Sequence, residues 1–198
     1  MKLSRPGPKL PRVRRRDESS GASFECRLCT IAAMTDFPDV TAIPYTTSFG
    51  DGWVAHAGDT VIELGLPGAA AVYPMARHAL SPAMRLAADL TDYWQGGELP
   101  SAPEGMLRTA GTTPLTEAIY RLVTAIPPGE TMTYADVAAA VGRPGAARAA
   151  GAAMAANRFA PVIPCHRVVG SDGTLRGYAG GLEMKRYLIT MEAGIAHV

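Results

Sequence analysis

The chain has 198 residues, of which 47% are hydrophobic and 19% charged, and its mean hydropathy is +0.06. With a net charge of only +1, this composition excludes wholesale disorder, which needs low hydrophobicity and high net charge. Three cysteines exclude a disulfide-stapled scaffold, and no apolar run approaches the roughly 20 residues of a membrane span. We expect a soluble, cytoplasmic protein without a signal peptide, because the basic start leads into a polar stretch rather than an apolar one.

The charge is unevenly distributed along the chain. Residues 1–16 carry seven basic groups and no acidic one, residues 17–111 carry 4 basic and 12 acidic groups, and residues 112–198 carry 8 basic and 6 acidic groups. This pattern is typical of a chain that places its C-terminal part against a polyanion, although a merely solubilising basic tail fits equally well. Prolines and small polar residues predict that residues 1–35 form a basic, disordered arm.

Residues 36–108 are expected to form a small N-terminal α/β domain. Short strands are predicted at residues 43–49, 53–57 and 60–66, with turns at Gly50-Asp51-Gly52 and at Gly58-Asp59. An amphipathic helix is predicted from Ser81, its N-cap, to Tyr93. Glycines end this helix, and residues 100–112 are expected to be an inter-domain linker.

The sequence of residues 109–198 predicts a helical domain. A tight turn with two glycines separates the second and third predicted helices, which is the helix-turn-helix pattern. The predicted fold class is therefore α+β, with an N-terminal β-meander and helix followed by a winged-helix-like domain. The three helices are expected to begin at Pro114 and end before Pro127, to run from Tyr134 (capped by Thr133) to Val141, and to run from Ala146 to Ala156.

The third predicted helix consists almost entirely of small residues. Its smooth surface would let the backbone approach another surface closely, and tight packing in a core is one interpretation. Arg148 argues against full burial, because an unpaired buried guanidinium is too costly. A smooth face with one projecting arginine suits a nucleic-acid groove, and the scarcity of long polar side chains indicates sequence-independent contact.

Cys165 lies in an apolar segment that predicts a buried strand or turn. The thiolate is the nucleophile, so a reactive cysteine needs a lowered pKa or a neighbouring base. His166 is the adjacent candidate, although neighbouring residues on an extended strand point to opposite faces. Pro164 could bend the chain, or a water could bridge the two side chains. On this dipeptide alone, a buried and unreactive cysteine is the plainer interpretation.

A longer set of motifs gives the segment a more specific meaning. The strings are Ile126-Pro127-Pro128-Gly129-Glu130-Thr131-Met132-Thr133-Tyr134, Ala147-Arg148-Ala149, Pro164-Cys165-His166-Arg167-Val168, Gly177-Tyr178-Ala179-Gly180-Gly181-Leu182 and Met191-Glu192-Ala193-Gly194. With these strings, the chain from about Thr113 to Gly194 resembles the O6-alkylguanine-DNA alkyltransferase family. Before this segment the resemblance is loose.

The resemblance implies a single-turnover DNA repair reaction without a cofactor. Cys165 would take the alkyl group from O6 of guanine, His166 would take the thiol proton through a water, and Glu192 would orient the imidazole. The helix-turn-helix of a monomer would bind the minor groove of double-stranded DNA. Its contacts would come from Thr133, Ala146, Ala147, Arg148, Ala149 and Gly151, with Arg148 replacing the extruded base in the stack.

The resemblance also implies the roles of the residues that hold the base. Tyr134 would donate to guanine N3, and Asn157 would tie the third helix to the segment with the cysteine. The backbone N–H of Ala179 would donate to O6, and the Val168 carbonyl would accept from the exocyclic amine. The expected pocket residues are Pro164, Val168, Tyr178, Ala179, Gly180, Gly181 and Lys185. The alternative function is a lesion-binding, alkyltransferase-like protein without transfer, against which Cys165 argues.

Cys26 and Cys29 form a lone C-x-x-C pair. A structural zinc needs four ligands, which His56 and His78 would supply only if the fold brought them to the cysteines. We predict no metal site. Two free thiols are the simplest interpretation of the pair, and a disulfide remains an alternative.

Overall fold

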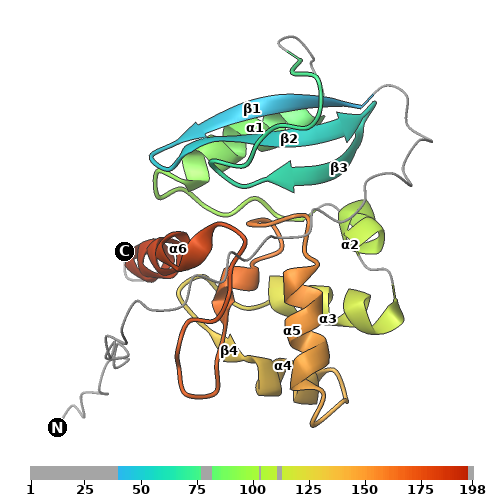
Figure 1. Ribbon diagram of the computed structural model, residues 1–198, viewed down its shortest axis with the longest axis vertical. Coiled ribbons are helices and arrows are strands. Elements are labelled where there is room, and N and C mark those ends of the chain that lie inside the picture. Colours follow the sequence, from blue (N-terminus) through green and yellow to red (C-terminus); the bar gives the residue numbers. More distant parts are fainter. Residues whose placement is uncertain (1–39, 77–81, 103, 111–112, 196–198) are drawn as a thin grey trace, which may run out of the picture.

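The computed structural model describes residues 40–76, 82–102, 104–110 and 113–195, and it has the predicted α+β fold. A three-stranded antiparallel sheet, in the order β1-β2-β3, forms one layer of the N-terminal half, and α1 packs against it (Figure 1). The elements are β1 (Thr41–Thr47), β2 (Gly50–Ala57), β3 (Thr60–Gly65) and α1 (Pro82–Tyr93). The predicted arm and Ser81 lie outside the described residues.

The turn between β1 and β2 differs from the prediction. Thr47 pairs with Gly50, so the turn consists of the two residues between them and precedes the predicted position at 50–52. Gly50 supplies the positive φ of 102° and already begins β2. Gly52 lies inside the strand because the ring of Tyr45 covers it, and a Cβ there would lie 2.2 Å from that ring. This glycine therefore permits a close approach rather than a turn.

The prediction that residues 100–112 form a linker is wrong in part. These residues contain the short helix α2 (Glu104–Ala110), and Met106 and Leu107 of this helix are buried in the core. Burial of these two apolar side chains outweighs the helix-breaking composition of the stretch. The second predicted turn, at Gly58-Asp59, is confirmed.

The C-terminal half is helical, with one short parallel strand pair, β4 with β5. The predicted helix-turn-helix is present as α4 and α5, which pack against each other. None of the helices in the described ranges has the length and apolar character needed to span a membrane. The elements are α3 (Pro114–Thr124), β4 (Met132–Thr133), α4 (Tyr134–Ala140), α5 (Ala147–Ala155), the 3-10 turn η2 (Cys165–Arg167), β5 (Val168–Val169) and α6 (Gly181–Ile195).

The helix starts follow the predicted capping. Thr113 caps α3, with Pro114 in the first turn. Thr133 caps α4 in a capping box: its Oγ1 accepts from Asp136 N at 3.1 Å, and the Asp136 carboxylate accepts from Thr133 N at 3.3 Å. Thr133 also pairs with Val169 of β5, so the start of α4 is fixed to the chain that follows η2.

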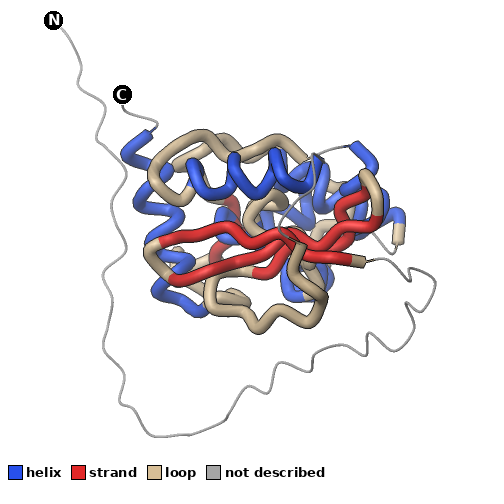
Figure 2. The backbone as a smooth tube through the Cα atoms, turned by 90° about the horizontal axis from the view of Figure 1, so that it is seen from above, coloured by secondary structure: helices blue, strands red, loops and turns tan. Residues whose placement is uncertain are grey.

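The two halves share one hydrophobic core. Trp94, just after α1, stacks on Tyr187 of α6 with ring centroids 6.0 Å apart and planes at 8°. The Tyr187 hydroxyl donates to the Trp94 carbonyl at 2.9 Å. Leu64 of β3 donates its backbone N–H to the Arg158 carbonyl at 2.8 Å. Seen from above, the strands run across the middle of the molecule with helices around them (Figure 2).

Candidate functional site

Cys165 lies in a closely packed segment between α5 and β5. Every residue from Phe159 to Gly170 is buried, and Cys165 is only 7% exposed. Its backbone N–H donates to the Ile163 carbonyl at 2.8 Å, across Pro164, which precedes the 3-10 turn. The predicted buried turn is thus present, and the thiol is free. A turn rather than an extended strand also removes the expectation that neighbouring side chains diverge.

The surroundings of Cys165 favour the protonated thiol over the thiolate. Burial raises the pKa of the thiol, because the charged thiolate loses solvation. A hydrogen bond with Asn157 and the positive charge of Lys185 act in the opposite direction and are weaker. The cysteine therefore needs a base to give up its proton.

His166 is completely buried and has one unused nitrogen. Its Nε2 lies 3.0 Å from Glu192 Oε1, and its Nδ1 has no hydrogen-bond partner among the described residues. Burial lowers the pKa of the imidazole, although Glu192 raises it in part. A neutral imidazole beside a carboxylate carries its proton on Nε2, so Nδ1 keeps a lone pair that can accept a proton.

Glu192 is the centre of the buried polar network. Oε1 accepts from His166, from the Tyr93 hydroxyl at 2.7 Å and from Arg167 Nη2 at 2.7 Å, and Oε2 accepts from Arg167 Nε at 2.9 Å. Burial alone would raise the pKa of this carboxyl, but hydrogen bonds from His166 and Arg167 outweigh burial and lower it to about 2. Glu192 is therefore a fixed negative charge behind the imidazole.

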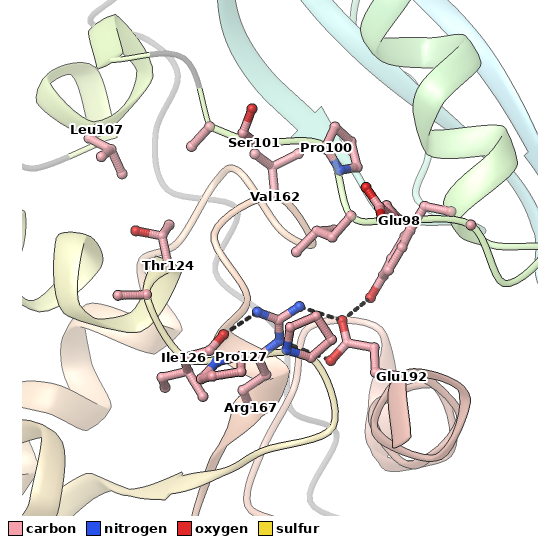
Figure 3. Close-up of a pocket in the computed structure, with 16 residues that line it drawn as sticks. Glu98, Pro100, Ser101, Leu107, Thr124, Ile126, Pro127, Val162, Arg167 and Glu192 are labelled. Atoms are coloured by element: carbon pink, nitrogen blue, oxygen red, sulfur yellow. Dashed lines mark hydrogen bonds and ion pairs between the residues drawn. The ribbon is translucent and has the colours of Figure 1, made fainter. Parts of the chain in front are cut away.

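Two members of this network, Arg167 and Tyr93, are not among the site residues predicted from the sequence. Arg167 also donates through Nη1 to the Ile126 carbonyl, so its three donor groups all have partners (Figure 3). Its position next to the cysteine–histidine pair is a signal that sequence reasoning could have used. Tyr93 lies 99 residues before Glu192, in the other half of the chain, and nothing in the local sequence marks this contact.

A cavity of about 520 Å³ lies behind the network. Tyr93 is among its lining residues. Arg167 and Glu192 lie on one side of it, and Glu98, Pro100 and Ser101, from the chain after α1, lie on another (Figure 3). Cys165 is not among its lining residues. This cavity is therefore separate from the sulfur and is not the expected base pocket.

Asn157 connects the end of α5 with the segment that carries Cys165. Its Nδ2 donates to the Ile163 carbonyl at 2.8 Å, and its Oδ1 accepts from Phe159 N at 3.0 Å. The side chain thus bonds the backbone on both sides of the bend that leads to the cysteine.

Lys185 is buried in α6 and bonds two carbonyls. Its Nζ donates to the Val168 carbonyl at 2.7 Å and to the Arg176 carbonyl at 3.1 Å. Burial lowers the pKa of its ammonium group to about 8, against the attraction of Cys165. The Val168 carbonyl, predicted to contact a base, therefore already accepts a hydrogen bond from Lys185.

Three tyrosines lie within electrostatic range of Cys165. Burial raises the pKa of Tyr120, Tyr134 and Tyr178, and a charge on Cys165 raises each of them further. Tyr120 donates to the Ala153 carbonyl at 2.7 Å, whereas the buried hydroxyl of Tyr178 has no partner among the described residues. The ring of Tyr178 stands edge-on to His166, with centroids 6.4 Å apart.

The predicted DNA-facing residues lie on the outer side of α5, at its start and, for Thr133, at the start of α4. Arg148 is exposed, while Ala150, Ala153 and Met154 face the core. Thr133 is half-buried, and its hydroxyl is engaged in the cap of α4. The remaining predicted contacts, Ala146, Ala147, Ala149 and Gly151, are partly exposed.

Two glycines lie where the loop joins α6, and each position requires glycine for a different reason. Gly181 has φ +84°, and a Cβ on Gly180 would lie 2.1 Å from the Met184 sulfur. Ala179 between Tyr178 and these glycines is exposed. The loop is thus open at Ala179 and packed against α6 at Gly180.

Of the four residues considered for zinc, only His56 lies in the described part of the chain. His56 bonds Thr41 Oγ1 at 3.2 Å and the Gly58 carbonyl at 2.9 Å through its two nitrogens. The described ranges contain no group of three metal-ligating side chains. Cys26, Cys29 and His78 lie outside the described residues.

Comparison with known proteins finds a family match for the C-terminal part of the chain. Residues 114–194 match the family model described as 6-O-methylguanine DNA methyltransferase, DNA binding domain. The resemblance to the O6-alkylguanine-DNA alkyltransferases is therefore confirmed over this part of the chain.

Particular relatives carry the name methylated-DNA–protein-cysteine methyltransferase. The protein of Salmonella typhimurium is 48% identical over 104 residues, which are 52% of this chain and 59% of that protein. The protein of Methanosarcina barkeri is 44% identical over 95 residues, which are 48% of this chain and 56% of that protein. The chain thus spans less than two thirds of the length of these relatives.

Solved structures extend the likeness to the N-terminal half. The O6-methylguanine methyltransferase of Mycobacterium tuberculosis superposes with a TM-score of 0.64 at 28% identity, covering 79% of this chain and 94% of that one. The Mycobacterium tuberculosis OGT in complex with DNA gives a TM-score of 0.66 at 29% identity with the same coverage. The α+β fold therefore agrees with that of these structures.

Proposed function

We propose that the protein is a DNA-repair alkyltransferase that moves the O6-alkyl group of guanine in duplex DNA to its own Cys165. The observation that carries this proposal is the buried arrangement of Cys165, His166 and Glu192, in which His166 Nδ1 has no partner in the described part of the molecule. The names of the relatives and the DNA complex of a structural neighbour support it.

The network suits removal of the thiol proton. Glu192, held by Arg167, accepts the Nε2 proton of His166 and so directs the Nδ1 lone pair toward a bridging water. That water takes the proton of Cys165 and passes one to Nδ1. Burial keeps the imidazole neutral beforehand, so that it is a competent base.

The alkyl transfer that follows needs no cofactor. The sulfur attacks the alkyl carbon, the bond from carbon to O6 breaks, and its electron pair stays on the guanine. The guanine takes up one proton through water, and His166 gives back the one it took from the thiol, so the proton count is unchanged. The Tyr134 hydroxyl would donate to N3 and offset the charge on the departing base. The product is intact guanine and a thioether on Cys165. Since no thiol is left, each molecule acts once.

The loop before α6 and the residues around Val168 would hold the base. Ala179, at the exposed point of the loop, would donate its N–H to O6. The Val168 carbonyl would accept from the exocyclic amine. Pro164, Tyr178 and the two glycines after Ala179 would form the walls of the pocket, and Lys185 would fix the Val168 carbonyl.

The helix-turn-helix would contact the minor groove without reading sequence. The partly exposed small residues of α5 allow close approach, and Arg148 would fill the space of the extruded base. All the proposed site groups come from one chain, so we propose that the protein works as a monomer on cellular DNA. In the proposed organisation, residues 109–198 bind and react, residues 36–108 support them, and residues 1–35 form the arm.

The proposal is tested by the mass of the intact protein after incubation with duplex DNA containing O6-methylguanine. We expect the wild-type protein to gain one methylene, mapped to Cys165, with one gain per molecule. The Cys165→Ala variant should gain nothing and still bind the lesion DNA. Binding of lesion DNA by the wild type without any mass gain would contradict transfer and favour the lesion-binding alternative.

A further inference from the structure

We infer that Tyr93, from the N-terminal half, is a positioning residue for the alkyl transfer: its hydroxyl holds the Glu192 carboxylate against His166. This inference rests on the proposed function of the site. Tyr93 is not expected to contact DNA, the base or the sulfur, and it acts through Glu192.

The hydroxyl bonds the carboxylate oxygen that faces the imidazole. Tyr93 donates to Glu192 Oε1 at 2.7 Å, and the same oxygen lies 3.0 Å from His166 Nε2. The hydroxyl is also 3.5 Å from that nitrogen. Arg167 Nη2 bonds the same oxygen at 2.7 Å, so three groups meet at Oε1. The position of Oε1 decides where the imidazole points.

Arg167 alone does not fix this oxygen in the same way. Its guanidinium bonds both oxygens of Glu192 and so draws the carboxylate toward itself. Tyr93 is a neutral donor in a different direction, so it restrains the carboxylate without adding a further positive charge beside His166. Burial and the neighbouring Glu192 raise the pKa of Tyr93, so its hydroxyl stays protonated and remains a donor.

The ring of Tyr93 is held by the domain interface. It is completely buried at the last residue of α1, and it packs edge-on against Trp94 with centroids 6.2 Å apart. Trp94 in turn stacks on Tyr187 of α6, the helix that carries Glu192. The N-terminal half therefore has a direct route to the polar network, in addition to its contribution to the core.

Tyr187 offers a matched control for Tyr93. Its hydroxyl makes one hydrogen bond across the same interface, to the Trp94 carbonyl, and within the described residues it makes no hydrogen bond with Glu192 or His166. Tyr93→Phe and Tyr187→Phe each remove one oxygen and one interface hydrogen bond. Thermal unfolding of both variants measures how far each substitution destabilises the fold.

The first test is the rate of alkyl transfer at saturating lesion DNA, measured alongside the affinity for that DNA. We expect Tyr93→Phe to slow transfer about tenfold, since a hydrogen bond to a charged group is removed, while DNA affinity stays unchanged. Tyr187→Phe should transfer within about twofold of the wild-type rate. Equal transfer rates for both variants, or a Tyr93→Phe rate that reaches the wild-type rate once the DNA is saturating, would overturn the inference.

The second test is nitrogen-15 NMR of His166, which does not depend on alkyl transfer. The wild type and Tyr187→Phe should show the imidazole proton on Nε2, whereas Tyr93→Phe should show a mixture of the two neutral tautomers. Identical spectra in all three proteins would overturn the inference. If the wild type transfers no alkyl group, the proposed function fails, and these spectra still decide the role of Tyr93.

Discussion

Glu192 illustrates how a single buried charge can be kept in place. It is 1% exposed, yet four hydrogen bonds from Tyr93, His166 and Arg167 satisfy its two oxygens. An ionised carboxylate without such partners would be too costly at this depth. The same bonds that stabilise the charge also aim it at the imidazole.

The lowered pKa of Glu192 predicts a specific acid sensitivity. Its pKa is about 2 in the folded protein, against about 4.3 in an unfolded chain. A carboxyl with a depressed folded-state pKa stabilises the fold above its unfolded pKa, and this stability is lost as the pH falls toward the folded value. Between about pH 5 and about pH 3, the wild type should lose roughly 1.5 kcal/mol more stability than Glu192→Gln.

Denaturant unfolding at a series of pH values measures this difference. The glutamine variant will have a lower stability at neutral pH, because it leaves Arg167 without a buried counter-charge. The test is therefore the change of unfolding free energy with pH and not its absolute value. Parallel pH curves for the two proteins would show that Glu192 is not the group concerned.

The residues of the site were predictable to different degrees. Cys165, His166 and Glu192 follow from the motif resemblance, and the structure places them in one buried cluster. Arg167 is adjacent in sequence, but its partner lies 25 residues later, on α6. Tyr93 could not be predicted, because its contact depends on how the two halves pack and leaves no periodic or local pattern in the sequence.

Among the elements, α4 has a clearly defined start. Thr133 and Asp136 exchange hydrogen bonds with each other's backbone, and Thr133 also pairs with β5. The helix has only seven residues, so its own hydrogen bonds stabilise it weakly and the cap has a large share in its stability.

The cap predicts different effects for two substitutions at one position. Thr133→Ala removes the oxygen that accepts from Asp136 N, and it should cost about 1 kcal/mol of unfolding free energy. Thr133→Ser keeps that oxygen and should stay within a few tenths of a kcal/mol of the wild type. Chemical denaturation measures both, and a serine variant as unstable as the alanine variant would contradict the role of the hydroxyl.

Helix boundaries were predictable because capping and proline signals are local. The starts at Pro114 and Tyr134 agree with the structure for this reason. The first hairpin turn was misplaced because Gly52 is needed under the Tyr45 ring, which is a tertiary reason for a glycine. The helix α2 was missed because burial, and not propensity, stabilises it.

At the scale of the whole molecule, the charge distribution complements the proposed partner. The seven basic groups of residues 1–16 precede a half of the chain in which acidic groups dominate. Cations that neutralise phosphates release counterions, which makes binding depend on salt concentration. An arm that joins the interface should therefore be visible in the salt dependence of binding.

Deletion of residues 1–16 should weaken binding to duplex DNA and flatten the plot of log affinity against log salt concentration. Each phosphate that the arm no longer neutralises should reduce the slope by about 0.9. A control protein with all seven basic residues replaced by serine separates charge from chain length and should behave like the deletion. An unchanged salt slope in both proteins would show that the arm does not contact the phosphates.

The pairing of β4 with β5 has a consequence for how the protein can change over time. It joins the start of α4 to the chain directly after Cys165 through backbone groups, in the pairs Met132 with Val168 and Thr133 with Val169. Backbone hydrogen bonds do not depend on which side chains the two strands carry. The outer surface of the helix-turn-helix can therefore accumulate substitutions that alter the proposed contact with DNA without displacing the sulfur, so the proposed recognition and the proposed reaction can evolve separately.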